Sequence, residues 1–531
     1  MGKNQGHKVN HRGNPKGRKL GVTELLVIDM LGIFVLALVL RLVPDFMEPP
    51  HVATDPDFWY YYMAAKEPAW FHQLYGVGQP LATTYFAAVA AFFSGLFRYS
   101  LAMTMKIGFA LVDSASALGL YLTGRQLYNR KAGILSGIAY AVSAQAIQGS
   151  ALKVRHDGFA VALVVFSGYT LARLSSCAGK KLYFPLTDLR VKSVPYLAIL
   201  AVLIYAAHLL TFYQFLVVVG VVGAFFMVSE VIALIDERKA IHVVMLAIMA
   251  VVAAYGFIHY DVAYFIGWSI SSSSFIIELA PFSPIYALEW LNLFLIFVPF
   301  GIYFALKNRE ALSLSLFLIT APLYYLALRG ILYFIIPVAL SFGISLRGVR
   351  LKKTLAAFVL IVAAINVGIY YNTFPAMVQD DGTTEAQYKA ALWIRGNSPG
   401  SALVLANWDR GHLIQAVAER NVVWAGQYVP SIGQIVSEAM YSIDESSSLH
   451  YLKELGSPTY IFLVQGTLIY YPSQQMLTYI TGIGSPPSGF NISLVPRTVL
   501  YRMLYDPSSL ADFREVYSSG GVYVFEVNYA D

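Results

Sequence analysis

Long apolar runs separated by short basic loops occupy roughly the first two thirds of the chain. The clearest runs, at residues 25–43, 194–210, 215–235, 291–306 and 354–371, are long enough to cross about 30 Å of hydrocarbon as helices. Together with the weaker runs between them they predict about 11–13 membrane-spanning helices, and about eleven fits the loop charges best. Residues 80–97 are also apolar, but a crossing there would invert every later basic loop. We therefore expect this segment to be a helix lying in or against the membrane.

The loop charges predict the orientation. Basic residues cluster at 125–131, 180–192, 238–239, 307–309 and 347–353, and the first 22 residues form a basic tail. Since cytoplasmic loops carry the excess of Lys and Arg, the tail is predicted to be cytoplasmic and the C-terminus extracytoplasmic. A nucleic-acid-binding arm is the alternative for the tail, but orienting the adjacent membrane span is the commoner use. We expect a multi-pass protein of the cell membrane that binds no nucleic acid.

The chain changes character after residue 371. Gly, Pro, Ser and charged residues separate shorter apolar stretches from there to the end. Residues 386–395 predict an amphipathic helix, and residues 402–405, 460–464 and 522–527 predict strands. The predicted organisation is a cytoplasmic tail (1–22), a mainly α membrane domain (23–373) with a large first external loop (45–101), and an extracytoplasmic α/β domain (374–531).

Composition supports this organisation. Apolar residues make up 57% of the chain and charged residues 13%, well below the charged share of about 25% that is typical of soluble domains. The single cysteine, Cys177, excludes a disulfide framework and a thiolate metal cluster. The first apolar run is longer than a signal-peptide core and no small-residue cleavage site follows it, so a cleaved signal is not expected.

Ionisable side chains occur at four places where the predicted outer loops meet the membrane. Such groups are energetically costly there and are often functional. They are Asp55 with Asp57, His156 with Asp157, Glu278, and Arg329.

Each of these places also has a structural explanation. The aromatic residues after Asp57 fit an interfacial belt, Asp157 fits a helix cap, Glu278 fits a solvated loop, and Arg329 fits an arginine that snorkels to the interface. Taken together, three acidic patches and one arginine on the same side describe a pocket for a divalent cation and an anion. Metal-assisted transfer from a lipid-linked phosphate suits such a set.

A motif in the outer domain connects these patches to a known family. Residues 403–414 contain Asn407-Trp408-Asp409-Arg410-Gly411. This segment resembles the one that carries the WWDYG motif in archaeal oligosaccharyltransferase catalytic subunits, and each membrane-boundary patch has a counterpart in order along nearly the whole chain. The resemblance implies a membrane-embedded glycosyltransferase of the GT-C class.

The resemblance also implies roles for individual residues. Asp55 resembles the aspartate that holds the metal and engages the acceptor amide, and Glu278 the glutamate that completes the acceptor site. His156 and Asp157 fall where the family has its second metal-binding motif, so a divalent cation, Mn²⁺ or Mg²⁺, is the expected cofactor. Arg329, eight residues before Pro337, resembles the arginine that contacts the phosphate of the lipid carrier.

Acceptor recognition is implied by the motif itself. Trp408 and Asp409 match its second Trp and its Asp, which bind the Ser or Thr of the acceptor. Asn407 stands where the family has its first Trp, and Arg410 where it has Tyr. Met476, expected on a helix, is the counterpart of the family's remaining hydroxyl-contacting residue. These departures bear on the strength of acceptor recognition and not on the fold.

The implied activity is transfer of an oligosaccharide from a dolichyl phosphate or pyrophosphate to the Asn of Asn-X-Ser/Thr sequences. The partners would be the lipid-linked donor, the acceptor protein and membrane lipids, with a single subunit as the expected form. Two alternatives remain open: a GT-C enzyme that moves a single sugar from a polyprenyl monophosphate, and a divergent paralogue with reduced activity. A transporter is disfavoured, because transporters place charges in mid-span and show two similar halves.

Overall fold

The computed structural model describes residues 22–53, 58–66, 92, 94–95, 100–148, 157–177, 182–209, 212–259, 284–326, 330–350, 352–380, 382–425, 430–465, 468–471, 476–479, 487 and 490–529. Four of the predicted site residues, Asp55, His156, Glu278 and Arg329, lie outside the described residues, as does nearly all of segment 80–97.

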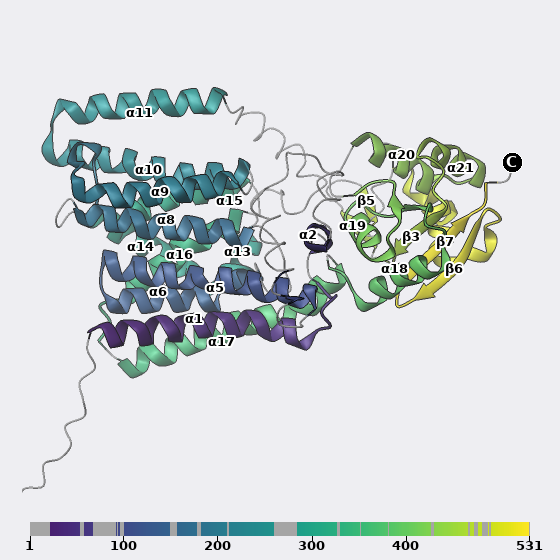
Figure 1. The fold of residues 1–531 in the computed structure, drawn as a ribbon, viewed down its shortest axis with the longest axis horizontal. Coiled ribbons are helices and arrows are strands. Elements are labelled where there is room, and N and C mark those ends of the chain that lie inside the picture. Colours follow the sequence, from purple (N-terminus) through teal and green to yellow (C-terminus); the bar gives the residue numbers. More distant parts are fainter. Residues whose placement is uncertain are drawn as a thin grey trace, which may run out of the picture.

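A layered helical bundle forms the N-terminal part of the molecule (Figure 1). Its described helices run back and forth along the long axis. They are α1 (Val22–Met47), α5 (Leu101–Leu127), α6 (Arg130–Val142), α8 (Asp157–Cys177), α9 (Val194–His208), α10 (Phe212–Glu237), α11 (Ala240–His259), η4 with α14 (Asn292–Phe297, Val298–Lys307), α15 (Ala311–Leu326), α16 (Ile331–Leu346) and α17 (Lys352–Asp380). Shorter pieces, α2 (Phe58–Lys66), α7 (Ala144–Gln148) and α13 (Pro284–Leu291), lie at one end of the bundle.

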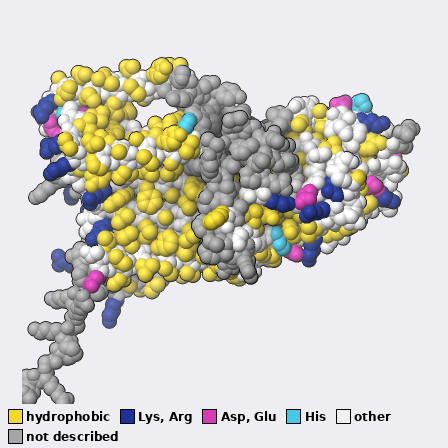
Figure 2. Space-filling model, viewed as in Figure 1, with side chains coloured by type: hydrophobic (Ala, Val, Ile, Leu, Met, Phe, Trp, Pro, Cys, Tyr) yellow, Lys and Arg dark blue, Asp and Glu magenta, His cyan; other side chains and the backbone are white. Residues whose placement is uncertain are grey.

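Length and composition make this bundle a membrane domain. Among the described residues, six helices are long and apolar enough to cross a bilayer, and four shorter apolar helices accompany them. Apolar side chains cover the lateral surface of the bundle (Figure 2). Helices α1, α9 and α17 bury only 17% of their most apolar windows inside the protein, because their outer faces would contact lipid. The predicted polytopic helical fold is confirmed.

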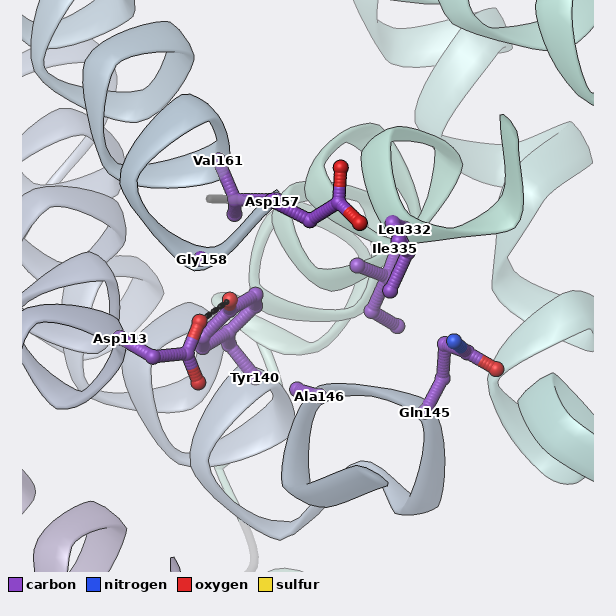
Figure 3. Close-up of a pocket in the computed structure, with 9 residues that line it drawn as sticks. All are labelled: Asp113, Tyr140, Gln145, Ala146, Asp157, Gly158, Val161, Leu332 and Ile335. Carbon is purple, nitrogen blue, oxygen red and sulfur yellow. Dashed lines mark hydrogen bonds between the residues drawn. The ribbon is translucent and has the colours of Figure 1, made fainter. Parts of the chain in front are cut away.

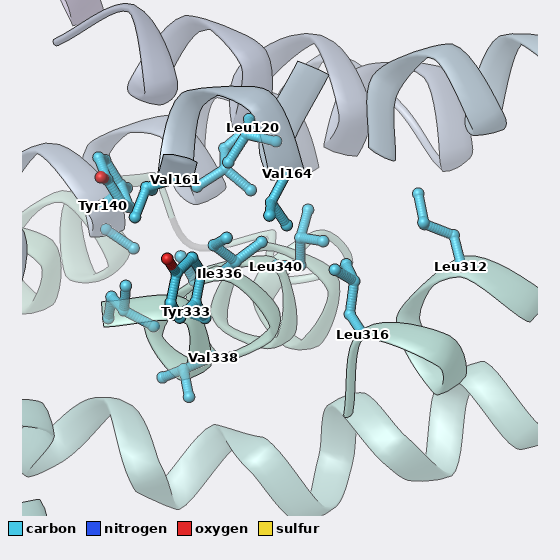
Figure 4. Packing of buried hydrophobic residues seen from close by; sticks show 14 of the residues in the cluster. Leu120, Tyr140, Val161, Val164, Leu312, Leu316, Tyr333, Ile336, Val338 and Leu340 are labelled. Atoms are coloured by element: carbon cyan, nitrogen blue, oxygen red, sulfur yellow. The ribbon is translucent and has the colours of Figure 1, made fainter. Parts of the chain in front are cut away.

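Helix α16 lies at the centre of the bundle. Its side chains are buried on nearly every side, as expected for a helix that is apolar all round. Tyr333, Ile336 and Leu340 pack against Leu120 and Val164 of neighbouring helices (Figure 4). Where α16 crosses α6, a Cβ added to Gly343 would lie 2.4 Å from the Ala132 carbonyl oxygen. A glycine therefore allows the close approach of these two helices.

The basic loops meet at the end of the bundle that lies away from the C-terminal domain (Figures 1 and 2). Asp29, a carboxylate in the first apolar run, accepts hydrogen bonds there from Arg130 Nε at 2.6 Å and Nη2 at 2.8 Å. Arg347 lies 4.6 Å from the ring of Tyr128, and Lys131 donates to the Val349 carbonyl. Loops far apart in sequence thus share one polar end, which supports the charge pattern used to count the spans.

The C-terminal part is a mixed α/β domain, as predicted. Its five-stranded sheet has the order β2-β1-β3-β7-β6, formed by β1 (Leu403–Leu405), β2 (Asn421–Val422), β3 (Tyr460–Val464), β6 (Phe513–Ser519) and β7 (Val522–Val527). Strand β1 pairs in parallel with β2 and β3, whereas β7 is antiparallel to β3 and β6. The three strands expected from the sequence are confirmed. The expected helix is present as α18 (Glu385–Asn397), which continues slightly past residue 395.

Helices cover both faces of this sheet. Helix α18, α19 (Gly411–Leu413) and the turn η6 (Ile414–Ala418) pack on one face, together with α2 of the first external loop. Helices α20 (Pro430–Tyr441), α21 (Glu445–Glu454) and α22 (Val499–Tyr505), with η7 (Ile492–Arg497), pack on the other. The short 3-10 turns are η1 (Leu186–Asp188), η2 (Val191–Ser193) and η8 (Pro507–Ser509), and β4 (Leu468–Tyr471) pairs with β5 (Met476–Tyr479) as a separate hairpin.

Candidate functional site

The motif residues Asn407, Trp408 and Asp409 lie directly after β1, in the tight turn that leads into α19. The Asn407 carbonyl accepts hydrogen bonds from the backbone N–H of Arg410 at 2.9 Å and of Gly411 at 3.0 Å. Strands β1, β2 and β3 are parallel, so the turn lies at the carboxyl edge of this part of the sheet, where α/β sheets commonly place binding residues.

Gly411 closes this turn against the neighbouring chain. A Cβ added there would lie 2.3 Å from the Trp424 carbonyl oxygen and 2.9 Å from the Ala425 Cα. Both contacts are to backbone, so no side-chain movement could relieve them. Trp424 is held in turn, because its indole Nε1 donates to the Ala406 carbonyl at 2.7 Å. The glycine of the motif is therefore required by the local packing.

Asp409 carries an unusual carboxylate. Its Oδ1 is shielded from solvent and has no hydrogen-bond partner among the described residues. Burial raises the pKa of Asp409, against the opposing effects of the adjacent Arg410 guanidinium and of the backbone N–H groups of Arg410 and Asp409, which interact with the carboxylate. A buried oxygen without a donor is costly, and such atoms need an explanation. Trp408, half-buried, packs at the edge of the core beside β1 and α20.

One of the predicted acceptor residues differs from expectation. Met476 opens β5 and is paired with Tyr471 of β4, so the expectation that it lies on a helix is wrong. The aromatic and β-branched residues of segment 468–479 favour a hairpin strand over a helix. Asn407, also a predicted acceptor residue, is 8% exposed, and its backbone carbonyl accepts the two hydrogen bonds of the turn.

The first external loop reaches this domain on both sides of Asp55. Ala53 forms a backbone bridge with Thr383, in which Thr383 N–H donates to the Ala53 carbonyl at 2.8 Å. On the other side, Trp59 Nε1 donates to the Thr383 hydroxyl at 2.9 Å. The Tyr60 ring lies 5.2 Å from that of His412, three residues after Asp409. The segments flanking Asp55 and the acceptor motif are thus brought together.

Asp157 lies at the end of the bundle opposite the basic loops. It is the first residue of α8, is 3% exposed, and its Oδ1 accepts a hydrogen bond from Gln214 Nε2 at 3.2 Å. With Asp113, Tyr140 and Gln145 it lines a small cavity of about 10 Å³ (Figure 3), which is the room of one water molecule. The helix-start position expected for Asp157 is confirmed, and its carboxylate also borders a small cavity of mixed polar and apolar lining.

A buried network beside this cavity was not predicted. Asp113 Oδ2 accepts a hydrogen bond from Arg41 Nε at 2.5 Å, and Oδ1 accepts one from the Tyr140 hydroxyl at 2.7 Å (Figure 3). Arg41 is fully buried and Asp113 is 2% exposed. The sequence did carry a signal, since each charge interrupts an otherwise apolar span. Their partnership across three helices was visible only in the structure.

The described residues include only part of the predicted metal site. Among them, no three His, Cys, Asp or Glu side chains group closely enough to hold an ion, and two of the three predicted ligands, Asp55 and His156, lie outside the described ranges. Asp157 offers carboxylate oxygens of the kind that hard divalent cations prefer. Both oxygens of Asp113 are already engaged by Arg41 and Tyr140, which argues against its being a ligand.

Solved structures share this arrangement. The oligosaccharyltransferase AglB from Archaeoglobus fulgidus, in complex with an inhibitory peptide and a dolichol-phosphate, superposes with a TM-score of 0.66 at 16% identity, covering 94% of this chain and 80% of that one. The chain has the fold of an archaeal oligosaccharyltransferase. A second structure of the A. fulgidus enzyme, tethered to an acceptor peptide containing the NVT sequon, gives a TM-score of 0.64 at 15% identity over 93% and 79% of the two chains.

A third similar structure broadens the comparison. ArnT from Cupriavidus metallidurans in the apo state gives a TM-score of 0.50 at 12% identity, covering 94% and 97% of the two chains. No protein-family model matches the sequence, and no curated protein matches it either. The likeness to the oligosaccharyltransferase fold is therefore carried by the three-dimensional arrangement of the membrane bundle and the C-terminal domain.

Proposed function

We propose that this protein transfers an oligosaccharide from a polyprenyl phosphate or pyrophosphate carrier to the asparagine of Asn-X-Ser/Thr sequences. The observation that carries the proposal is the unpartnered, buried Oδ1 of Asp409 in a motif that follows a central strand. The hydroxyl group of an acceptor Ser or Thr would donate the hydrogen bond that this oxygen lacks. The archaeal oligosaccharyltransferase fold, which A. fulgidus AglB shares, supports the same conclusion.

Asp409 and Trp408 would bind the acceptor without taking part in bond making. The carboxylate accepts a hydrogen bond from the Ser or Thr hydroxyl, and the half-buried indole packs beside it. Fixing the hydroxyl two residues beyond the asparagine positions the amide for reaction, which is a contribution of orientation. Asn407 replaces one aromatic wall of the familiar motif, so we expect weaker acceptor binding than a tryptophan pair would give.

Asp55 and Glu278 would present the acceptor amide. Amide nitrogen is a poor nucleophile because its lone pair is delocalised into the carbonyl. Two carboxylates that accept hydrogen bonds from the amide N–H groups would hold the nitrogen toward the sugar. The anchoring of Ala53 and Trp59 on Thr383 supports this role for Asp55, because it fixes the chain on both sides of the carboxylate.

The donor phosphate would be bound from the membrane side. Arg329 would contact it through its guanidinium, whose paired donors match phosphate oxygens. Asp55, His156 and Asp157 are the residues that would hold Mn²⁺ or Mg²⁺, and the bound ion would neutralise charge on the leaving phosphate. The Asp157 carboxylate at the outer end of α8 and its bond from Gln214 support this assignment.

Purified full-length protein tests the proposal. It is incubated with lipid-linked oligosaccharide and an Asn-X-Thr peptide, and the peptide is weighed by mass spectrometry. We expect a glycan-sized mass increase that is absent with a Gln-X-Thr peptide, strongly reduced with Asn-X-Ala, and abolished by chelator.

Three outcomes count against parts of the proposal. Equal modification of Asn-X-Ala and Asn-X-Thr would remove the role of Asp409 and favour a transferase that moves a single sugar to another acceptor. Full activity in excess chelator would discard the metal assignment. Transfer by the Asp55→Asn variant at the rate of the unaltered protein would discard the catalytic assignment.

A further inference from the structure

A second cavity lies where α2 meets the C-terminal domain, separate from the acceptor motif. Its volume is about 310 Å³, within the range of small-ligand sites. The residues that line it come from the first external loop, from the start of α5, from α18 and from η6. Helix α2 lies between the membrane bundle and the C-terminal domain (Figure 1).

Two helices present the same order of chemistry to this cavity. On α2, Trp59 and Tyr62 are followed by Lys66, and on α18 Tyr388 is followed by Arg395. The spacings of three, four and seven residues place each set on one helix face. Along each helix the aromatic side chains therefore come first, and the cationic side chain follows about one to two turns later.

The aromatic end of the cavity is preorganised. Tyr388 stacks on Trp59 with ring centroids 5.8 Å apart and on His51 at 4.0 Å. The Tyr62 ring lies edge-on to Trp59 at 5.3 Å. Packing on several sides fixes these rings before any ligand arrives. Trp59 is only 3% exposed and Tyr388 is stacked on both His51 and Trp59, so the half-buried Tyr62 is the ring that can offer its surface to the apolar C–H face of a pyranose.

The cationic end has two positive groups and one shared carboxylate. Lys66 Nζ lies 2.9 Å from Glu419 Oε1, and Arg395 Nη2 lies 3.0 Å from Glu419 Oε2. All three side chains are 38–50% exposed. Ion pairs this exposed contribute little to protein stability, because water screens them. An incoming anion can therefore compete with Glu419 for both cations.

We propose that this cavity binds an acidic sugar, such as a uronic acid or a sulfated residue, of the transferred glycan. Tyr62 would pack on the pyranose, and Lys66 and Arg395 would bind its carboxylate or sulfate. This inference rests on the proposed function for its ligand class, a glycan. It adds a subsite that selects among glycans by charge, and neither Asp55 nor Asp409 lines it.

A binding measurement on the full-length protein in detergent, without donor or acceptor, tests the subsite. The probes are a disaccharide that contains glucuronic acid and the matching disaccharide that contains glucose, titrated by ligand-observed NMR. We expect the acidic probe to bind at least about tenfold more tightly, because a charge-assisted hydrogen bond is worth about twice a neutral one. Equal affinity for the two probes would overturn the proposal.

Variants separate ligand binding from a purely structural contact. Lys66→Gln and Arg395→Gln should each weaken binding of the acidic probe about tenfold, as expected for loss of one hydrogen bond to a charged group. The matched control is Lys389→Gln on the same helix α18, since Lys389 is 61% exposed, pairs with Glu385 and does not line the cavity. It should leave the affinity unchanged. Unchanged binding in both cavity variants would overturn the proposal.

Glu419→Gln provides the sharpest test. If Glu419 competes with the ligand for the cations, the variant should tighten binding of the acidic probe severalfold, whereas weaker binding would overturn that role. An acidic peptide that competes equally well would show a peptide groove and overturn the glycan assignment. Because binding is measured without turnover, failure here leaves the transferase activity to stand, and loss of transferase activity with intact binding sinks the proposed function alone.

Discussion

Trp59 and Thr383 are joined by a hydrogen bond of 2.9 Å across 324 residues of sequence. Both are buried, Thr383 completely and Trp59 to within 3% of full burial. Thr383 also pairs with Ala53 through its backbone. One threonine after the last membrane helix therefore holds the segment after α1 on both sides of Asp55, and couples the membrane domain to the C-terminal domain.

Removing the indole donor should destabilise the protein. Trp59→Phe keeps an aromatic ring but leaves the buried Thr383 hydroxyl without this donor, at a cost of about 1–3 kcal/mol. The double variant Trp59→Phe with Thr383→Val replaces both partners by apolar groups and should recover much of that loss. Denaturant unfolding in detergent measures both. Equal stability of the single variant and the unaltered protein would show that the bond contributes little.

The Asp409 carboxylate, which we propose binds the acceptor, should lower the stability of the folded protein at neutral pH. Its pKa in the folded protein is raised above the ordinary 3.8 by burial, so the folded state holds its proton more tightly than the unfolded state. The contribution of protonated Asp409 to the free energy of unfolding is full below pH 3.8, and it is lost as the pH rises through the raised pKa. Asp409→Asn should therefore raise the melting temperature at pH 7, with the difference shrinking toward pH 4.

Removing the Asp409 carboxylate should stabilise the folded protein but weaken its binding of the acceptor peptide. Asp409→Ala should raise the peptide KM by roughly 10- to 150-fold, the equivalent of about 1.5–3 kcal/mol for a hydrogen bond to a charged group, with a smaller change in kcat. Glu278→Ala should mainly lower kcat. Asp444→Ala is a matched control, because Asp444 caps α21 by accepting from Ser447 N–H and lies outside the motif. An unchanged peptide KM for Asp409→Ala would contradict the assignment.

The buried Arg41–Asp113 pair should matter more than an exposed pair in the same bundle. Arg41→Leu leaves a buried carboxylate without its cation and should cost about 3–5 kcal/mol. Arg130→Gln removes a pair with Asp29 in which Arg130 is 48% exposed, and should cost about 1 kcal/mol or less. Thermal unfolding of the two variants in the same detergent compares them. Similar losses would show that the Asp113 network is not held by charge.

Thiol labelling tests the predicted orientation. Cys177 is the sole cysteine, so Cys177→Ser gives a background without thiols. Ser508→Cys, exposed in the C-terminal domain, should react with a membrane-impermeant maleimide on intact cells. Asn308→Cys, exposed at the basic end of the bundle, should react only after lysis. Labelling of the second variant in intact cells would reverse the topology and remove the proposed site from the outer face.

The elements whose physics is local could be predicted from the amino-acid sequence alone. Apolar length against hydrocarbon thickness identified the membrane helices, and the character change after residue 371 identified the α/β domain. Strands β1, β3 and β7 followed from runs of β-branched and aromatic residues between turn-forming ones. The motif around Trp408 and Asp409 was also visible, because its meaning lies in a few adjacent residues. Met476 was misjudged, since a short apolar segment does not distinguish helix from hairpin strand.

Only the tertiary structure decided which distant residues meet. Asp29 is a charged residue within the first apolar run, and its partner Arg130 lies 101 residues away. Arg41, Asp113 and Tyr140 come from three helices, and no spacing rule links them. The second cavity likewise forms because two helices more than 300 residues apart in sequence pack on the same face of one sheet. Its lining includes Trp59 and Lys66 from one helix and Tyr388 and Arg395 from the other. Side-chain periodicity is a property of one element, whereas a site is a property of how several elements pack.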